Sequence, residues 1–163
     1  MLPNRKTTRL EKFDYSHFGV YFVTICTSKR ICNLAKIDHT TLGIQVVLLP
    51  IGEIAEKWLN RIPEYAQDYQ LAQYTIMPNH IHLLLRIRYN EHASPKSLMS
   101  VIGWLKYQIT KDVRENIFSV EFPLFQRSFY DHIVRNQDDY ERIAKYMYEN
   151  PVMWQEDRFF SNE

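Results

Sequence analysis

Three segments of the chain repeat their apolar residues at intervals of three and four, which is the period of an amphipathic helix. The first runs from Pro50 to about Pro63, and the second covers residues 98–113. The third begins after Asn136, a residue type that caps helix N-termini, and Pro151 ends it. Its apolar stripe consists of Tyr140, Ile143, Ala144 and Met147. The pattern therefore predicts three helices after residue 49.

Segments rich in β-branched and aromatic residues predict strands at residues 20–27, 44–49 and 71–87, the second being a strand or the end of a hairpin. Pro78 interrupts the third segment and must lie at a bulge or a strand start, because proline cannot donate to a sheet. Residues 89–95 read as a loop, and residues 116–130 as irregular and partly extended. The order β, β, α, β, α, (β), α predicts an α+β fold, with an antiparallel sheet and helices mainly on one face.

Length and composition fit one globular domain. The chain has 163 residues, of which 45% are hydrophobic and 24% charged. We find no repeat and no linker, so we predict a single domain over residues 1–163, with residues 1–16 as a basic N-terminal arm. No apolar run approaches 18 residues, and no hydrophobic stretch directly follows Arg5, Lys6 and Arg9. We therefore expect no membrane span, no signal peptide and a cytoplasmic protein.

The formal net charge is only +1, but the charges are distributed unevenly. Basic residues outnumber acidic ones in the first twelve positions and across residues 86–114, whereas acidic residues concentrate after Gln137. Phosphate-binding proteins usually carry such local basic patches. Solvated helix faces explain much of the pattern equally well, so it gives nucleic-acid binding modest support.

The segment 77–85 reads Met-Pro-Asn-His-Ile-His-Leu-Leu-Leu. Side chains of a strand alternate between its faces, so His80 and His82 project from the same side. Two imidazoles at this spacing on a rigid strand can hold one divalent cation. The alternative is a pair of half-buried histidines in an ordinary core strand.

A second constellation lies at the end of the third predicted helix. At about 100° per residue, Tyr146 and Asn150 lie one turn apart on one flank of the apolar stripe. Tyr148 lies on the opposite flank and cannot share a site with Asn150. If the segment is a helix, the geometry therefore selects Tyr146 over Tyr148 as the residue that can share a site with Asn150.

Five strings in this order resemble the REP-associated tyrosine transposases, a branch of the single-tyrosine HUH (histidine-hydrophobe-histidine) family of single-strand DNA transposases. They are residues 19–27, 77–82, 125–127, 130–136 and 146–151. The resemblance implies a ferredoxin-like or RRM-like palm in a prokaryotic, nucleoid-associated protein. It also implies that His80, His82 and Asn150 bind Mg²⁺ or Mn²⁺, with Tyr146 as nucleophile. Ligand type alone favours Mn²⁺, because Mg²⁺ prefers oxygen donors.

The reaction implied is metal-dependent cleavage and strand transfer on single-stranded DNA near a hairpin or inverted repeat, through a 5′-phosphotyrosine. His132 matches a family position and could contact phosphate, shuttle a proton or form a structural hydrogen bond. Further expected DNA contacts are Arg5, Lys6, Arg9, Lys106, Lys111, Arg127 and Arg135. Arg127 and Arg135 could instead pair with neighbouring aspartates. We expect a monomer or a homodimer.

Rival functions differ at particular residues. A histidine-triad hydrolase would carry a third histidine where this chain has Leu84. A two-histidine phosphodiesterase uses H-x-T/S elements, which this chain has at residues 39–41 and 92–94 but not at His80. A relaxase or replication initiator would use the same chemistry in a larger protein. A non-catalytic module that binds single-stranded DNA or RNA remains an alternative, but it gives no reason for Tyr146 and Asn150 to share a face.

Overall fold

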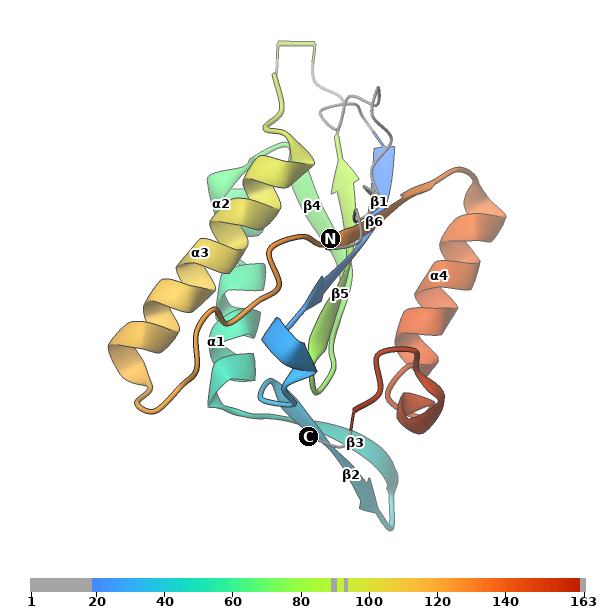
Figure 1. Ribbon diagram of the computed structural model, residues 1–163. Coiled ribbons are helices and arrows are strands. Elements are labelled where there is room, and N and C mark those ends of the chain that lie inside the picture. The colour runs from blue at the N-terminus through green and yellow to red at the C-terminus, as the bar shows by residue number, and fades with distance from the viewer. Residues whose placement is uncertain (1–18, 89–90, 93, 162–163) are drawn as a thin grey trace, which may run out of the picture.

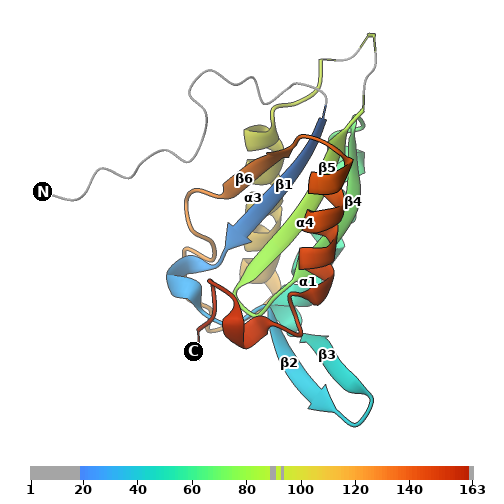
Figure 2. The ribbon, with the colours of Figure 1, turned by 90° about the vertical axis from the view of Figure 1, so that its right-hand side faces the viewer.

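The centre of the fold is a four-stranded antiparallel sheet with strand order β4-β5-β1-β6 (Figure 1). The computed structural model describes residues 19–88, 91–92 and 94–161. The sheet strands are β1 (Gly19–Cys26), β4 (Tyr69–Ile76), β5 (His80–Ile87) and β6 (Tyr130–Val134). A separate hairpin of β2 (Ala35–Thr40) and β3 (Gly43–Leu48) projects beyond the sheet, at the bottom of Figure 2.

Helices cover both faces of this sheet unequally. Within the described residues, α1 (Pro50–Leu59), α2 (Ile62–Tyr65) and α3 (Leu98–Asn116) lie on one face, and α4 (Gln137–Glu149) lies on the other (Figure 1). Two short 3-10 turns, Ser28–Arg30 and Trp154–Glu156, complete the helical elements of this part of the chain. The α+β fold with an antiparallel sheet and helices mainly on one face is therefore confirmed.

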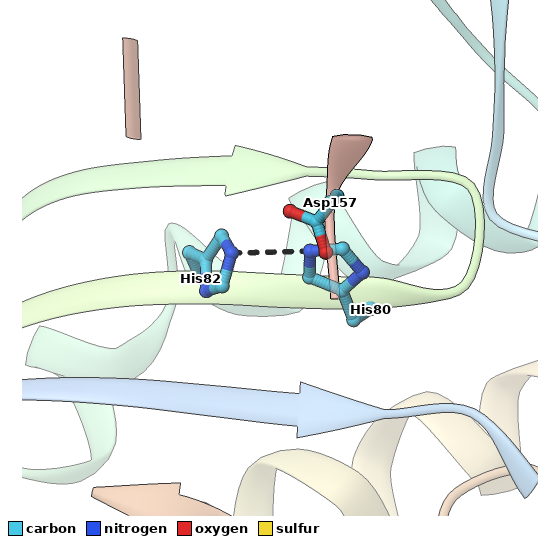
Figure 3. Close-up of side chains that lie close together, drawn as sticks. All are labelled: His80, His82 and Asp157. Atoms are coloured by element: carbon cyan, nitrogen blue, oxygen red, sulfur yellow. Dashed lines mark hydrogen bonds between the residues drawn. The ribbon is translucent and has the colours of Figure 1, made fainter. Parts of the chain in front are cut away.

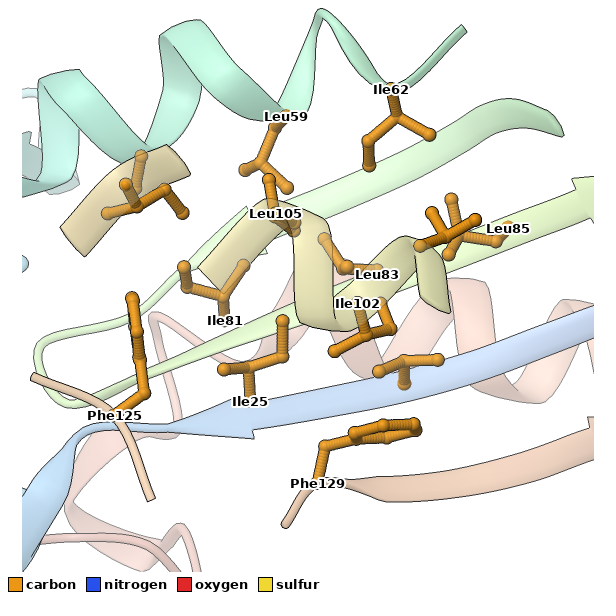
Figure 4. Packing of buried hydrophobic residues seen from close by; sticks show 14 of the residues in the cluster. Ile25, Leu59, Ile62, Ile81, Leu83, Leu85, Ile102, Leu105, Phe125 and Phe129 are labelled. Carbon is orange, nitrogen blue, oxygen red and sulfur yellow. The ribbon is translucent and has the colours of Figure 1, made fainter. Parts of the chain in front are cut away.

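The central strand β5 decides where the core and the polar site lie. All residues from His80 to Leu85 are buried, because helices cover both faces of the strand. Ile81, Leu83 and Leu85 face α1 and α3 in the main hydrophobic core (Figure 4). The alternate residues face α4, where the apolar cluster is small: its buried members are Leu84, Ile143 and Met147, and partly buried side chains pack around them. Because side chains alternate between the faces of a strand, both histidines lie on the α4 face, where the apolar cluster is smaller.

Most element boundaries agree with the pattern of the sequence. The segment 71–87 forms the hairpin β4-β5 with Pro78 in its turn, where the Met77 amide donates to the His80 carbonyl at 2.8 Å. The apolar segment 44–49 is the second strand of a hairpin, whose first strand β2 is mostly polar and exposed. The last strand of the predicted order, which was expected within residues 116–130, corresponds to β6 and begins only at Tyr130. None of the helices in the described ranges is long and apolar enough to cross a membrane.

Candidate metal and tyrosine site

Two imidazole rings of β5 form the centre of the site. His80 Nε2 and His82 Nε2 are 3.0 Å apart, and both side chains are almost completely buried (Figure 3). Two ligand atoms that each lie about 2.1 Å from one ion, at a right angle, are separated by about 3.0 Å. The observed separation therefore fits a shared cation.

The other nitrogen of each ring has a fixed partner. His80 Nδ1 lies 2.9 Å from Asn79 Oδ1, and His82 Nδ1 lies 2.8 Å from Thr24 Oγ1 on β1. Outer partners of this kind orient metal-binding imidazoles. Burial lowers the pKa of His80 to about 4. Burial, together with the neighbouring His80, also holds the pKa of His82 well below its usual value. Both rings are therefore neutral at pH 7, as metal ligation requires.

Helix α4 brings the predicted third ligand and the tyrosine to these rings. Asn150 Oδ1 lies 3.4 Å from His80 Nε2, and the Tyr146 hydroxyl lies 3.4 Å from His82 Nε2. The backbone N–H of Asn150 donates to the backbone carbonyl of Tyr146 at 2.9 Å, so the two residues are one helical turn apart. Tyr148 is 81% exposed. The structure thus brings together His80, His82, Tyr146 and Asn150.

Asp157 belongs to the same cluster, and sequence reasoning missed it. Its Oδ2 accepts hydrogen bonds from the Tyr146 hydroxyl, at 3.2 Å, and from the Asn150 side-chain amide. Ligand atoms of His80, His82 and Asp157 all lie within 4.8 Å of one another (Figure 3). Asp157 lies in the irregular segment that follows α4, which has no apolar period. Its position comes from the return of this segment towards β5, which no local pattern reveals.

Tyr146 is protonated in this arrangement. Burial raises the pKa of its phenol to about 12, and the adjacent Asp157 carboxylate adds to the shift. A phenolate next to a carboxylate is electrostatically unfavourable. Ionisation of Tyr146 at neutral pH therefore needs a positive charge close to its oxygen.

A cavity of about 500 Å³ opens beside Tyr146 and His82. It is lined by Phe22, Thr24, Tyr130, Asp131, His132, Arg142, Ile143 and Arg158. His132 Nε2 lies 2.8 Å from Asp139 Oδ2, and Arg142 donates to the other oxygen of the same carboxylate at 2.5 Å. These hydrogen bonds, chiefly that from His132, hold the pKa of Asp139 below its usual range. Basic and aromatic groups together suit an anionic ligand that carries a ring.

The other residues expected to bind DNA lie away from the histidines. Lys106, on α3 across the sheet, donates to the carbonyls of Gln126 and Arg127 at 2.6 and 3.0 Å. Lys111, Arg127 and Arg135 are exposed. Arg5, Lys6 and Arg9 lie outside the described residues. The DNA contacts of these residues stay predictions.

Comparisons with family models and with known proteins both point to transposases. The family model described as IS200-like transposase matches residues 49–150. An uncharacterized protein of Haemophilus influenzae is 25% identical over 176 aligned positions, which cover 98% of this chain and 94% of that protein. A second protein of this organism, provisionally named REP-associated tyrosine transposase, is 24% identical over 147 positions, covering 85% and 73%.

Two solved structures share the fold. A REP-associated tyrosine transposase bound to a REP hairpin matches with a TM-score of 0.64 and 18% identity, over 91% of this chain and 74% of that one. A provisionally identified transposase from Deinococcus radiodurans matches with a TM-score of 0.53 and 15% identity, over 86% and 97%. Because the family model spans more than half of the chain, including both histidines and Tyr146, the chain belongs to the IS200-like transposases and is similar to the REP-associated tyrosine transposases among them.

Proposed function

We propose that this transposase cleaves single-stranded DNA with Tyr146 as nucleophile, at a site that holds one divalent cation. The observation that carries the proposal is the convergence of the Tyr146 hydroxyl on a buried cluster of two neutral imidazoles and Asn150. A purely structural histidine pair would not need a tyrosine and an amide from another element. The non-catalytic binding module is disfavoured for the same reason.

The side chains present fit Mg²⁺ or Mn²⁺. His80 Nε2, His82 Nε2 and Asn150 Oδ1 are the three expected ligands, and the Asp157 carboxylate is a fourth. Two nitrogen and two oxygen donors suit Mn²⁺ and, with water or phosphate oxygens added, are compatible with Mg²⁺. When bound, the cation supplies polarisation of the scissile phosphate and compensates the negative charge that develops on its oxygens.

In the proposed cleavage, the Tyr146 oxygen attacks phosphorus and the bond from phosphorus to the 3′ oxygen breaks. The phenolic proton passes to Asp157, its nearest carboxylate acceptor. The departing 3′ oxygen takes a proton from solvent. The product is a 5′-phosphotyrosine, whose phosphoester bond can later be attacked by a 3′-hydroxyl, which releases Tyr146 and joins the strands without an external energy source.

The cavity beside Tyr146 is the proposed position of the nucleotide at the scissile phosphate. Its volume lies within the range of small-molecule sites, about 300–1,000 Å³. Arg142 and Arg158 supply positive charge, and Phe22 and Tyr130 supply rings that can contact a base. We assign His132 to phosphate contact, because it lines the cavity while Asp139 holds its Nε2.

The proposed partner is a single strand that contains a hairpin. A solved structure with the same fold is described as bound to a REP hairpin. The proposed further DNA contacts are Arg5, Lys6, Arg9, Lys106, Lys111, Arg127 and Arg135. The protein works as a monomer or a homodimer in this proposal.

The test is replacement of Tyr146 by phenylalanine, which removes one oxygen and little volume. Fold and DNA binding should persist, whereas cleavage and the covalent protein–DNA adduct should disappear together. The assay is denaturing electrophoresis with a labelled hairpin strand and Mn²⁺, followed by mass spectrometry of the adduct peptide. Tyr148→Phe is the matched control and should retain the adduct.

Each other outcome has a distinct meaning. An adduct on a different tyrosine would reject Tyr146 but keep the reaction class. Cleavage without any adduct would indicate attack by water and hence a nuclease. Hairpin binding without cleavage by the wild-type protein would favour the binding module.

A further inference from the structure

Asn79 lies in the turn between β4 and β5, directly before His80, and only 1% of it is exposed. Its Oδ1 lies 2.9 Å from His80 Nδ1. Its Nδ2 donates to the Phe159 carbonyl at 2.8 Å and to the Arg30 carbonyl at 3.2 Å. Carbonyl oxygens only accept hydrogen bonds, so these two contacts assign the amide nitrogen and leave Oδ1 facing His80.

This orientation selects one tautomer of His80. Asn79 Oδ1 can only accept, and it lies 2.9 Å from Nδ1, closer than Asn150 Oδ1, which lies 3.4 Å from Nε2, so a neutral His80 ring carries its proton on Nδ1. Its Nε2 then presents a lone pair to the position shared with His82 and Asn150. That is the protonation state in which an imidazole binds a cation through Nε2.

The same amide also holds the segment that carries Asp157. Phe159, one of its two carbonyl partners, is two residues beyond Asp157, and the Phe159 amide donates to Asp157 Oδ1 at 2.6 Å. The other partner, Arg30, has a φ of 58°, in the left-handed region. Such backbone conformations persist where surrounding contacts hold them. Asn79 therefore connects three segments that meet at the cluster.

We propose that Asn79 is a positioning residue, which fixes His80 as the Nδ1-protonated tautomer and anchors the Asp157 segment, so that the cation ligands are preorganised. This inference deepens the proposed function and rests on it for the identity of the ligand. Substitution of outer partners of metal-binding histidines typically weakens metal binding 10- to 100-fold. A loss of that size is the expected effect of removing the Asn79 amide.

His82 should behave differently from His80. With His80 Nε2 unprotonated, the 3.0 Å contact between the rings needs a hydrogen on His82 Nε2 when no cation is bound. The Thr24 hydroxyl, 2.8 Å from His82 Nδ1, can then donate to that nitrogen. On cation binding the same hydroxyl can accept instead, because a hydroxyl does both. His82 thus changes tautomer with the cation, whereas His80 does not.

The test is long-range ¹H–¹⁵N NMR of the histidine rings, in metal-free protein and with Mg²⁺, which is diamagnetic. Wild-type His80 should be protonated at Nδ1 in both states, and His82 should move its proton from Nε2 to Nδ1. In Asn79→Leu, His80 should populate both tautomers and calorimetric Mn²⁺ affinity should fall 10- to 100-fold. Asn79→Asp keeps an acceptor for Nδ1–H, so the His80 tautomer should be rescued.

Thr75→Val is the control, because Thr75 lies opposite His82 on β4 but donates to the Met147 carbonyl. Near-UV circular dichroism checks the fold of each variant. Wild-type protein that binds Mn²⁺ with His80 protonated at Nε2 would overturn the role of Asn79 alone, and so would unchanged tautomer and affinity in folded Asn79→Leu. Wild-type protein that binds no divalent cation would overturn the proposed function and, with it, the cation role of Asn79.

Discussion

Burial shifts the pKa values of the proposed cation ligands and of the proposed nucleophile in opposite directions. It lowers the pKa of His80 to about 4, which keeps the ring neutral and able to bind a cation at pH 7. It raises the pKa of Tyr146 to about 12, which keeps the phenol protonated. Both shifts have the same cause, since a low-dielectric environment disfavours the charged form. In the proposed function, a bound cation would offset this disadvantage for Tyr146 and so couple ionisation of the phenol to cation binding.

Asp157→Asn tests the carboxylate that the sequence did not reveal. Removing its charge should lower the pKa of Tyr146 from about 12 towards the usual value near 10. Mn²⁺ affinity should fall at least tenfold, because an anionic ligand is lost. The measurements are ¹³Cζ-tyrosine NMR titration and calorimetry. Glu156→Gln, at the exposed neighbouring position, is the control. Unchanged Mn²⁺ affinity would exclude Asp157 as a ligand.

Thr24 and Thr75 form a natural pair, because each lies opposite His82 on a neighbouring strand. Thr24→Val removes the hydroxyl beside His82 Nδ1 and should weaken Mn²⁺ binding about tenfold. Thr75→Val removes only a hydrogen bond to the Met147 carbonyl. It should leave Mn²⁺ affinity unchanged and cost about 1 kcal/mol of stability in urea unfolding. Equal losses of affinity in both variants would argue against a specific role of Thr24.

At the scale of elements, α4 is held on the sheet by a small apolar cluster and by hydrogen bonds from Gln73 and Thr75 of β4. The helix carries Tyr146 and ends at its C-cap residue Asn150. Met147 is completely buried in that cluster, between the two site residues in the helix. The position of Tyr146 relative to β5 therefore depends on a few apolar contacts and on these two hydrogen bonds.

Met147→Ala should destabilise the protein by about 2–5 kcal/mol, since it leaves a cavity between α4 and Leu84. It should also slow adduct formation under conditions where the protein remains folded, because Tyr146 loses its fixed position. Urea unfolding and the electrophoretic adduct assay measure the two effects. Tyr148→Ala, at an exposed position on the same helix, should change stability by no more than about 0.5 kcal/mol. A similar cost in both variants would contradict this account of α4.

At the scale of the whole molecule, the two buried histidines make stability depend on pH. Both are neutral in the folded protein, whereas in the unfolded chain they titrate near 6.5. Below that pH the unfolded chain binds more protons than the folded one, so stability rises with pH. Burial of His80 and His82 on the α4 face of the sheet is thus compatible with a stable fold at neutral pH and destabilises the fold at acidic pH.

In EDTA, the free energy of unfolding should therefore fall by a few kcal/mol between pH 6.5 and pH 4, as His80 and His82 remain deprotonated only in the folded state. Urea titrations at several pH values measure this slope. The double variant His80→Gln, His82→Gln should show a shallower slope, whereas His39→Gln, on the exposed hairpin, should retain the wild-type slope. Identical slopes in all three proteins would contradict the role of burial.

The pattern of the sequence predicted the elements because burial is periodic. The long helices and the hairpin around Pro78 follow from apolar spacing and from proline chemistry. The edge strand β6 was located less well, as it is short and only partly buried, with one paired neighbour in the sheet. The shared face of His80 and His82, and that of Tyr146 and Asn150, also follow from local geometry alone.

What the sequence determined by itself is thus each pair of site residues, because a strand and a helix have fixed periods. Only the tertiary structure decided that the two pairs meet, since this depends on α4 packing against the face of β5 that carries the histidines. It also decided the place of Asp157 and the three contacts of Asn79, which join irregular segments far apart in the chain. Irregular segments have no period, so their positions follow from side-chain hydrogen bonds and packing that form only in the folded molecule.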